Sequence, residues 1–543
     1  MKINTVQTHP YPDQKLGTSG LRKQTCVFLK NPNYLENFVQ SIFDTIKAKG
    51  KTLVLGGDGR FYNDHALQVI LKMAIANEVA CIRIGQNGLF STPAISAVIR
   101  KYKTDGGIIL SASHNPAGEK GDFGIKVETK NGAPSPIEIS DKIFEKTKSI
   151  KSFKIADMPD IPLDKIGTKT YGKTKIMIMS STKDYIELMQ EIFDFPAIKK
   201  LFKSGFTFRY DAMNAVAGPY AKEIFEDILG AKKGSVVRGT PLPDFGGLHP
   251  EPNLHYERDL VEFMKTKDAP DMAVASDGDA DRYMILGRNF FVAPDNSLAI
   301  LVKYANLIKG YQSGVKGVAR SMPTAPAVDR VAQKMKINVY ETPTGWKYFG
   351  SLLDAGKITF CGEESFGSGS NHIREKDGIW AILYWLNILA VTGKSIQQIV
   401  TEHWKEFGRD YYLRHDFMNL PSSKAADFMD DMQNNLKSFV GKKLAGLTVK
   451  DAWDFEYTDP VTKEKVEHCG IMITLSNDSK IIYRLSNTGT VGATLRVYFH
   501  AYEEKPRTWN KKPTTVLKQS IKAAYEIAQI KKRFGRIRPN QIT

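Results

Sequence analysis

Short apolar runs that stop in glycine-rich or polar turns recur along the chain. Residues 52–55 and 80–84 have the length and composition of buried strands, and residues 65–77 between them carry apolar side chains at helical spacing. This strand–helix–strand order predicts a parallel sheet covered by helices. The same plan begins again with a strand at 206–211 and once more after residue 300, which suggests internal repetition.

Three other apolar runs lead directly into turns that carry polar side chains. Residues 108–110, 272–275 and 358–361 are each predicted to be a short strand, and residues 183–195 are predicted to be a helix. The longest apolar run, 379–391, is too short to cross a bilayer, so it predicts a core helix.

Length and composition indicate a folded protein of three or four domains. A chain of 543 residues exceeds what one hydrophobic core organises, and its 42% hydrophobic and 25% charged residues are typical of globular proteins. After Gly393 the chain becomes richer in Lys, Asp and Asn up to about Lys450, which indicates a domain boundary near 396–408.

The charge balance favours anionic ligands. Lys and Arg (76) exceed Asp and Glu (59) by 17, and this sign suits nucleic acid, acidic membranes or phosphorylated metabolites. The basic residues are spread evenly and no aromatic repeat accompanies them, which favours small phosphates over nucleic acid. Four widely spaced cysteines without a C-x-x-C pair indicate reduced thiols in a cytosolic chain, and the polar segment 1–14 predicts no secretory signal.

The segment 106–116, Gly-Gly-Ile-Ile-Leu-Ser-Ala-Ser-His-Asn-Pro, places serines on a turn after a buried strand. A rigid turn of this kind holds a hydroxyl open to a cleft. Nothing nearby resembles the G-x-S-x-G nucleophile elbow, so a hydrolase triad is not the natural interpretation. Taken alone, these serines favour an ordinary polar turn, and only the later motifs overturn that interpretation.

A second segment is predicted to bind a metal ion. Asp277, Asp279 and Asp281 follow the strand 272–275, and three carboxylates at alternate positions converge only when a cation offsets their repulsion. A calcium hand requires Gly and Glu where this chain has Arg282 and Arg288, so the pattern favours another hard divalent cation.

Residues 167–174, Gly-Thr-Lys-Thr-Tyr-Gly-Lys-Thr, formally fit the Walker A pattern of ATPases. The preceding residues 157–164 are rich in Pro and Asp, and the following residues 175–179 are predicted to be a strand rather than a helix. A phosphate-binding loop needs a buried strand before it and a helix N-terminus after it, so we reject this interpretation.

Three more turns combine hydroxyls, glycines and charges. They lie at 17–23, where Arg22 and Lys23 follow two glycines, at 362–367, where Glu363 and Ser365 stand two residues apart, and at 484–496. Carboxylates and hydroxyls bind sugar hydroxyls, and an arginine grips a phosphate through two N–H groups. Each turn alone is weak as a signal.

Together these motifs resemble, in order, those of the α-D-phosphohexomutases, and most closely the eukaryotic-type phosphoglucomutases. The likeness rests on Gly17–Lys23, Ser111–Pro116, Gly121–Lys126, Ser276–Arg282, Gly362–Gly367 and Arg484–Thr490, and it covers nearly the whole chain. It implies that Ser113 carries a phosphoryl group and that Mg²⁺ is bound by the three aspartates and the serine phosphate. Interconversion of α-D-glucose 1-phosphate and glucose 6-phosphate through glucose 1,6-bisphosphate is the activity that it implies.

The resemblance also assigns roles residue by residue. It implies catalytic roles for Ser113, His114, Lys126, Arg22 and Lys376, without ranking the three cations for proton handling or support of a negative oxygen. The substrate-binding residues that it implies are Thr18, Ser19, Arg282, Thr344, Gly345, Glu363, Ser365, Arg484, Ser486, Asn487, Thr488 and Arg496. Metal ligation is implied for Ser113, Asp277, Asp279 and Asp281.

Departures from the family pattern are expected to matter little. Val127 and Glu128 replace aromatic and amide residues, and Ser276 stands where many relatives carry Phe, so we expect changes of packing there. Asn487 replaces a Gly, and Asn tolerates a positive φ better than other residues, so we expect a working loop. Two alternatives stay open: a mutase of broader sugar choice, and a catalytically weak paralogue that serves as a scaffold or secretion-associated phosphoprotein.

The resemblance implies three similar α/β domains and a smaller α+β C-terminal domain around a central cleft. We expect them at 1–182 with the serine loop, 183–303 with the metal loop, 304–398 with the sugar-binding loop and 399–543 with the phosphate-binding loop. The expected protein is cytoplasmic, a monomer or weak dimer, and binds sugar phosphates but neither nucleic acid nor a membrane.

Overall fold

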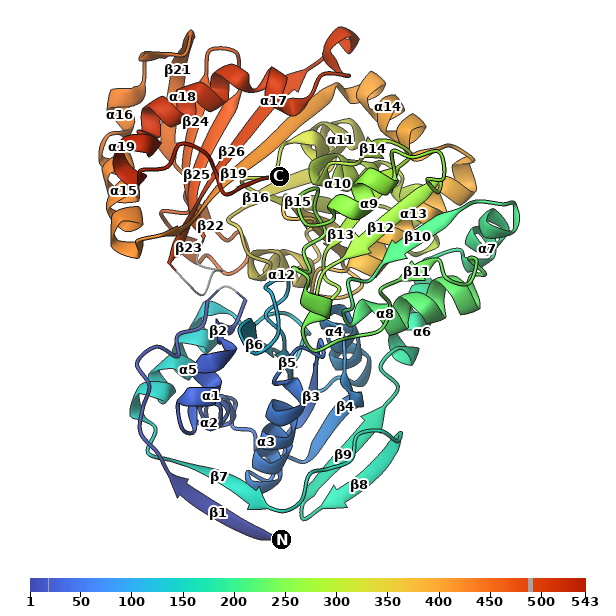
Figure 1. Cartoon of the computed structure of the whole chain (residues 1–543), viewed down its shortest axis with the longest axis vertical. Coiled ribbons are helices and arrows are strands. Elements are labelled where there is room, and N and C mark those ends of the chain that lie inside the picture. Colours follow the sequence, from blue (N-terminus) through green and yellow to red (C-terminus); the bar gives the residue numbers. More distant parts are fainter. Residues whose placement is uncertain (18, 487–491) are drawn as a thin grey trace.

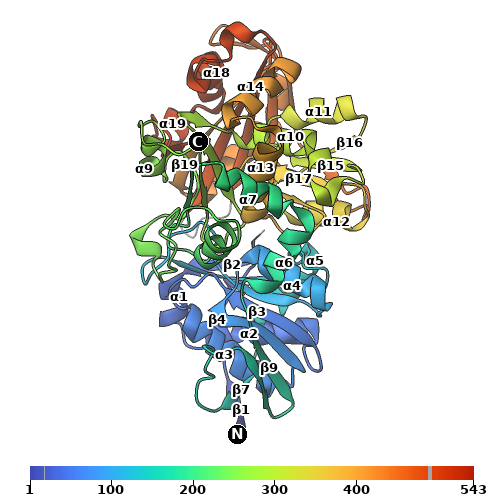
Figure 2. The same ribbon diagram turned by 90° about the vertical axis from the view of Figure 1, so that its right-hand side faces the viewer.

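The structure is a computed structural model of the chain and describes residues 1–17, 19–486 and 492–543. Three α/β units and a C-terminal unit built on an antiparallel sheet follow one another along the chain, as expected. Figures 1 and 2 show the N-terminal unit at the lower end of the molecule and the C-terminal unit at the upper end.

The N-terminal unit is a seven-stranded sheet flanked by helices. Its strands are β2 (Leu21–Gln24), β3 (Thr52–Gly57), β4 (Cys81–Leu89), β5 (Gly107–Leu110), β6 (Asp122–Glu128), β8 (Gly167–Tyr171) and β9 (Thr174–Met179). Its helices are α1 (Thr25–Lys30), α2 (Tyr34–Ile46), α3 (Asn63–Ala76), α4 (Thr92–Tyr102) and α5 (Ile137–Ser149). β1 (Lys2–Gln7) and β7 (Ser152–Asp157) form a separate antiparallel pair.

The Walker A look-alike lies in this unit as an antiparallel hairpin. Gly167 opens β8, Thr174 opens β9, and the two strands pair through Tyr171 and Thr174. No helix follows the turn, so the structure confirms that this segment is not a phosphate-binding loop.

The second unit has a five-stranded sheet. Its elements are α6 (Lys183–Ile192), α7 (Phe195–Lys203), β10 (Phe208–Asp211), α8 (Ala217–Ala221), β11 (Val236–Val237), α9 (Arg258–Phe263), β12 (Met272–Ser276), β13 (Tyr283–Gly287) and β14 (Phe290–Phe291). The helix predicted over 183–195 is wrong at its end. Phe193 is extended, and Asp194 caps a new helix by accepting a hydrogen bond from the Ala197 N–H.

The third unit has a four-stranded sheet. Its elements are α10 (Pro294–Lys303), β15 (Gly317–Ser321), α11 (Ala327–Met335), β16 (Asn338–Thr342), α12 (Lys347–Asp354), β17 (Phe360–Glu363), β18 (Gly367–Ser370), α13 (Gly378–Thr392) and α14 (Ile396–Phe407).

One strand arrangement recurs in these three units. A central strand (β3, β10 or β15) pairs in parallel with its two neighbours, and one of those neighbours then pairs antiparallel with the next strand of the chain. The antiparallel pairs are β5–β6, β12–β13 and β17–β18. The turns inside these pairs carry Ser113, the three aspartates and Glu363–Ser365, so each unit supplies one chemical loop from the same position of its sheet.

The C-terminal unit is a seven-stranded sheet, antiparallel throughout. Its strands are β19 (Arg409–Leu420), β20 (Lys443–Leu444), β21 (Leu447–Asp454), β24 (Ile471–Leu475), β25 (Lys480–Ser486), β26 (Ala493–Glu503) and β27 (Gln541–Ile542). The helices α15 (Ser422–Asn434) and α18 (Lys518–Ala528) pack on it through Phe428, Met432 and Ile527.

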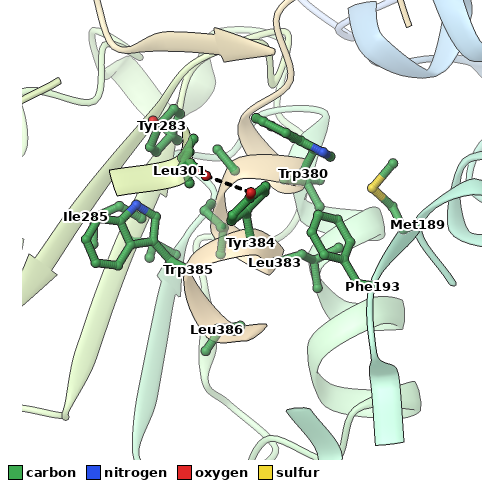
Figure 3. Close-up of a cluster of buried hydrophobic side chains, with 14 of the residues drawn as sticks. Met189, Phe193, Tyr283, Ile285, Leu301, Trp380, Leu383, Tyr384, Trp385 and Leu386 are labelled. Atoms are coloured by element: carbon green, nitrogen blue, oxygen red, sulfur yellow. Dashed lines mark hydrogen bonds between the residues drawn. The ribbon is translucent and has the colours of Figure 1, made fainter. Parts of the chain in front are cut away.

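The predicted core helix is α13, which is buried over nearly its whole length. Figure 3 shows its Trp380, Tyr384 and Trp385 among side chains of the second and third units, and the Tyr384 hydroxyl donates to the Leu301 carbonyl over 2.7 Å. The same apolar cluster extends into α4 of the first unit, so the three α/β units pack against one another. Among the described residues no single helix meets the length and hydropathy of a membrane span; α13 and α14 do so only as a pair bent by 86°.

Candidate active site

Ser113 lies in the turn between β5 and β6 in a constrained backbone conformation. Its φ is +53°, in the left-handed region that serine adopts rarely, and its N–H donates to the Ser111 hydroxyl over 2.7 Å. Its Oγ donates to Asp277 Oδ2 over 2.9 Å. The strain is held by surrounding contacts and directs this hydroxyl at the metal loop of the next unit.

Arg60 supplies many of those contacts, and sequence reasoning missed it. Its guanidinium donates to the Ser113 carbonyl over 2.7 Å and to the Asp122 carbonyl over 2.9 Å. Its Nε contacts the carboxylate of Asp58 at 2.9 Å, and both side chains are fully buried. The only signal in the sequence was Asp58-Gly-Arg60 directly after the strand β3.

Replacing Arg60 with alanine should lower the free energy of unfolding by about 3–5 kcal/mol, because Asp58 would keep a buried charge without a partner. Urea unfolding measures this loss. The double variant Asp58→Asn/Arg60→Ala is the control and should recover part of it. A loss below about 1 kcal/mol in the single variant would contradict the ion pair.

The three predicted metal-binding aspartates converge in the turn between β12 and β13. One carboxylate oxygen of each of Asp277, Asp279 and Asp281 lies within 4.8 Å of the others, and all three side chains are buried. A Cβ on Gly278 would meet the Ser113 carbonyl at 2.5 Å, so only glycine permits the close approach of the two loops.

The unpaired oxygens of this cluster fit a cation. Asp279 Oδ1 and Asp281 Oδ1 are buried and accept no hydrogen bond from the described residues. Burial and the neighbouring carboxylates Asp281 and Asp279 raise the pKa of Asp277 well above its usual range. A hard divalent cation would relieve both costs, because it binds carboxylate oxygens and offsets their repulsion.

Two lysines contact the same aspartates. Lys126, on β6, donates to Asp279 Oδ2 over 2.6 Å and to the Thr92 hydroxyl over 3.3 Å. Burial acts to lower the pKa of Lys126, but Asp279 and Asp281 outweigh it and raise the pKa. Lys376 Nζ lies 3.4 Å from Asp281 Oδ2. Lys126 is therefore a fixed positive charge rather than a base.

His114 and Arg22 also lie beside the serine. The His114 Nδ1 is 3.4 Å from Ser113 Oγ, and burial together with the charge of Arg282 lowers the pKa of this imidazole well below its usual value. Burial lowers the pKa of Arg22 to about 10, so this side chain stays charged at neutral pH. His114 is therefore neutral at neutral pH and adds no charge beside the serine.

A cavity of about 820 Å³, counted with its open mouth, joins loops of all four units. Its described lining has six cationic side chains and five carboxyl groups, which suits a ligand with a phosphate at each end. The cations are Arg22, Lys126, Arg282, Lys376, Arg484 and Arg496, and the acids are Glu128, Asp281, Glu363, Glu364 and Glu375.

The two predicted sugar loops meet in this cavity. The Gly345 N–H donates to the Glu363 carboxylate over 3.0 Å, and Lys376 Nζ lies 3.9 Å from Glu363 Oε2. Thr344 and Ser365 line the same wall. On the facing unit, Arg484 of β25 stands directly opposite Arg496 of β26, so two guanidinium groups project from one face of that sheet.

The structure brings together most of the residues predicted from the sequence. Ser19 lines the cavity with the residues just named. Ser113, Asp277 and Asp279 are buried and are not part of its lining, and Ser486 is buried at the end of β25. Thr18, Asn487 and Thr488 lie outside the described residues, and so does the prediction about Asn487. The hydroxyl groups of Ser276 and Tyr210 share a hydrogen bond of 2.6 Å in the core.

Sequence reasoning missed the residues that connect these loops. Thr92, at the start of α4, donates to Asp279 over 2.7 Å, and Glu251 lies within 4.0 Å of both Arg282 and Arg414. Glu128 was expected to affect packing more than chemistry, yet it lines the cavity. Thr92 and Glu251 lie in segments without a chemical pattern, and only the fold brings them to the site.

Models of four domains match consecutive parts of this chain. They describe domains I, II and III of phosphoglucomutase/phosphomannomutase at residues 13–154, 183–289 and 293–407, and the vertebrate and fungal phosphoglucomutase-1 C-terminal domain at 409–540. The chain belongs to the phosphoglucomutase/phosphomannomutase family. The α/β/α descriptions of domains I–III agree with the repeated sheet, and a metal ion is implied for the family site.

Individual members of the phosphoglucomutase/phosphomannomutase family cover the chain completely. It is 50% identical to a phosphoglucomutase of Rhizobium radiobacter and 46% identical to human phosphoglucomutase-1, with all of each chain covered. The crystal structure of pp63/parafusin, a phosphoglucomutase from Paramecium in an open form, has a TM-score of 0.90 and 45% identity over 100% of this chain and 99% of that one.

Proposed function

We propose that this protein is a phosphoglucomutase that interconverts α-D-glucose 1-phosphate and D-glucose 6-phosphate. The relatives with this name match the chain over its full length, and they do not favour the alternative of a catalytically weak scaffold. The observation that carries the proposal is the 2.9 Å contact of Ser113 Oγ with a buried three-aspartate cluster, whose Asp281 lines the cationic cavity.

In the proposed reaction, phosphorylated Ser113 gives its phosphoryl group to the free hydroxyl of the sugar phosphate. The bond from serine oxygen to phosphorus breaks as the bond from sugar oxygen to phosphorus forms. The proton of the sugar hydroxyl ends on the serine oxygen, and glucose 1,6-bisphosphate results. This intermediate reorients in the cavity, so that its other phosphate group is returned to Ser113. Phosphoryl transfer of this kind is accelerated mainly by positioning and by neutralising charge.

The side chains of the site divide this work. Mg²⁺ held by Asp277, Asp279, Asp281 and a serine phosphate oxygen would offset the charge of the moving group. Lys126 and Arg282 hold positive charge beside it, while Arg484 and Arg496 face the cavity where the second phosphate would bind. Lys376 lies between Asp281 and Glu363, so we assign it to support of the sugar oxygen.

A coupled assay tests the proposal. Glucose 1-phosphate with catalytic glucose 1,6-bisphosphate and Mg²⁺ should yield glucose 6-phosphate, detected with glucose 6-phosphate dehydrogenase. Intact-protein mass spectrometry should show one added phosphoryl group, mapped to Ser113. Mannose 1-phosphate in parallel tests a broader sugar choice. No turnover of either sugar by phosphorylated protein would contradict the proposal.

Replacing Glu363 with alanine should lower kcat/KM for glucose 1-phosphate by about 10²-fold, because a hydrogen-bonding partner is lost from a polar pocket. Steady-state kinetics measures this change. Ser113 of the variant should still accept a phosphoryl group from glucose 1,6-bisphosphate, which is the control for folding. Unchanged kinetics would remove this loop from sugar recognition.

Domain boundaries, location and assembly complete the proposal. We propose four domains, with the first boundary after residue 182 as expected. The other two boundaries are placed before Pro294 and after Phe407, instead of after residues 303 and 398, because α10 and α14 belong whole to the third unit. We also propose a cytoplasmic monomer or weak dimer. The four cysteines Cys26, Cys81, Cys361 and Cys469 are free, which suits a reducing compartment.

A further inference from the structure

Glu128 places a carboxyl group in the substrate cavity, and the proposed reaction assigns no role to an unpaired negative charge there. It ends β6, two residues after Lys126, so both side chains leave the same face of the strand. Glu128 is only 3% exposed and lines the cavity. A buried carboxyl in a cavity that binds anionic sugars repels its ligand unless its charge is removed or shared.

The partner of Glu128 is a second buried acid. Both carboxyl oxygens of Glu128 are buried, and no donor group among the described residues bonds to them. The carboxyl group of Glu375, itself 3% exposed, lines the same cavity and interacts with that of Glu128. Two carboxylates in contact cannot both be ionised at little cost, but one proton between them supplies the missing hydrogen bond.

The other charges around this pair come from three elements. Lys126 belongs to β6, Lys376 follows Glu375 in the chain, and Asp279 and Asp281 come from the metal loop. Lys126 already donates to Asp279, and Lys376 lies against Asp281. Neither lysine is therefore left to neutralise two full charges on the glutamates.

We propose that Glu128 and Glu375 share one proton, and that this singly charged pair holds Lys126 against Asp279 and keeps the cavity wall receptive to phosphorylated sugars. A protonated Glu128 donates to Glu375 as an amide would. Loss of the shared proton adds a second negative charge beside Lys126, which draws Lys126 from Asp279 and repels the substrate phosphates. Both glutamates are positioning residues, and this inference rests on the proposed function.

Electrostatics supports the arrangement. Burial, followed by repulsion from Glu375, raises the pKa of Glu128 well above its usual range, and burial raises the pKa of Glu375 to about 7. A carboxyl whose pKa is raised by folding stabilises the folded state at low pH and loses that contribution as the pH rises toward the folded value. Loss of the shared proton at alkaline pH should therefore lower both the activity and the stability of the protein.

The activity test compares pH profiles of kcat/KM for glucose 1-phosphate with Mg²⁺ present. The kcat/KM of the unmodified protein should decline above neutral pH. In Glu128→Gln this decline should be absent or should begin at least about one pH unit higher. Glu375→Gln should give the same profile as Glu128→Gln, because either change leaves one charge and one donor. Superimposable profiles of the unmodified protein and both variants would overturn the proposal.

Thermal unfolding tests the shared proton without using turnover. The melting temperature of the unmodified protein should fall relative to that of Glu128→Gln between about pH 6 and pH 9. Glu257→Gln is the matched control, because Glu257 is also a buried acid with a raised pKa, of about 8, but lies outside the cavity. The pH profile of kcat/KM for this variant should follow that of the unmodified protein. A difference in melting temperature between the two proteins that stays constant with pH would overturn the shared proton, whether or not the protein has mutase activity. The expected pH trend in a protein without turnover would instead contradict the proposed function.

Discussion

Replacing Ser113 with alanine should lower turnover of glucose 1-phosphate by at least about 10⁴-fold, roughly 5.5 kcal/mol of transition-state stabilisation. The serine hydroxyl contacts the aspartate cluster from the facing loop, at 2.9 Å from Asp277. Alanine has no oxygen that could carry the phosphoryl group, and His114 lies beside the serine oxygen, with its Nδ1 at 3.4 Å, rather than in its place. The coupled assay and mass spectrometry measure turnover and phosphorylation.

Ser111→Ala is the matched control for this variant. Ser111 is also buried in the serine loop, but its hydroxyl accepts the Ser113 N–H rather than facing the aspartates. The control should still take one phosphoryl group from glucose 1,6-bisphosphate, with reduced turnover if the loop relaxes. Near-native turnover by Ser113→Ala would show that the phosphoserine mechanism is wrong.

The sequence predicted the repeated units because each chemical loop directly follows a short buried strand. The strands at 108–110, 272–275 and 358–361 correspond to β5, β12 and β17, and Asp277, Asp279 and Asp281 converge as their alternate spacing indicated. Hydrophobic periodicity and glycine turns depend only on residues that are close in the chain, so they can be recognised from the sequence alone. The family likeness then gave the order of the units.

Contacts between distant segments could not be predicted in this way. Arg60 donates to the serine loop across 53 residues and Thr92 donates to Asp279 across 187. Nothing in the sequence near either residue names its distant partner. Glu128 was expected to alter packing more than chemistry, because nothing near it in sequence shows that it interacts with Glu375. The break between α6 and α7 was missed for another reason: the extended Phe193 interrupts an otherwise helical spacing.

Removing the metal should abolish turnover, and adding Mg²⁺ should restore it. The unpaired buried oxygens of Asp279 and Asp281 and the raised pKa of Asp277 all describe a site that needs positive charge. Activity is measured after dialysis against EDTA and again after addition of Mg²⁺. Full turnover by protein stripped of metal would contradict the assignment of these aspartates.

Asp279→Asn should weaken Mg²⁺ binding at least about tenfold, measured by isothermal titration calorimetry so that the result does not depend on turnover. The variant removes one ligand charge and places an amide where Lys126 and Thr92 now donate at 2.6 and 2.7 Å. Asp295→Asn is the matched control, since Asp295 is a buried acid whose pKa burial raises to about 7, but it lies on α10 and outside the three-aspartate cluster. Equal Mg²⁺ affinities of Asp279→Asn and the unmodified protein would mean that Asp279 serves only as the partner of Lys126, and the metal would have to be bound elsewhere.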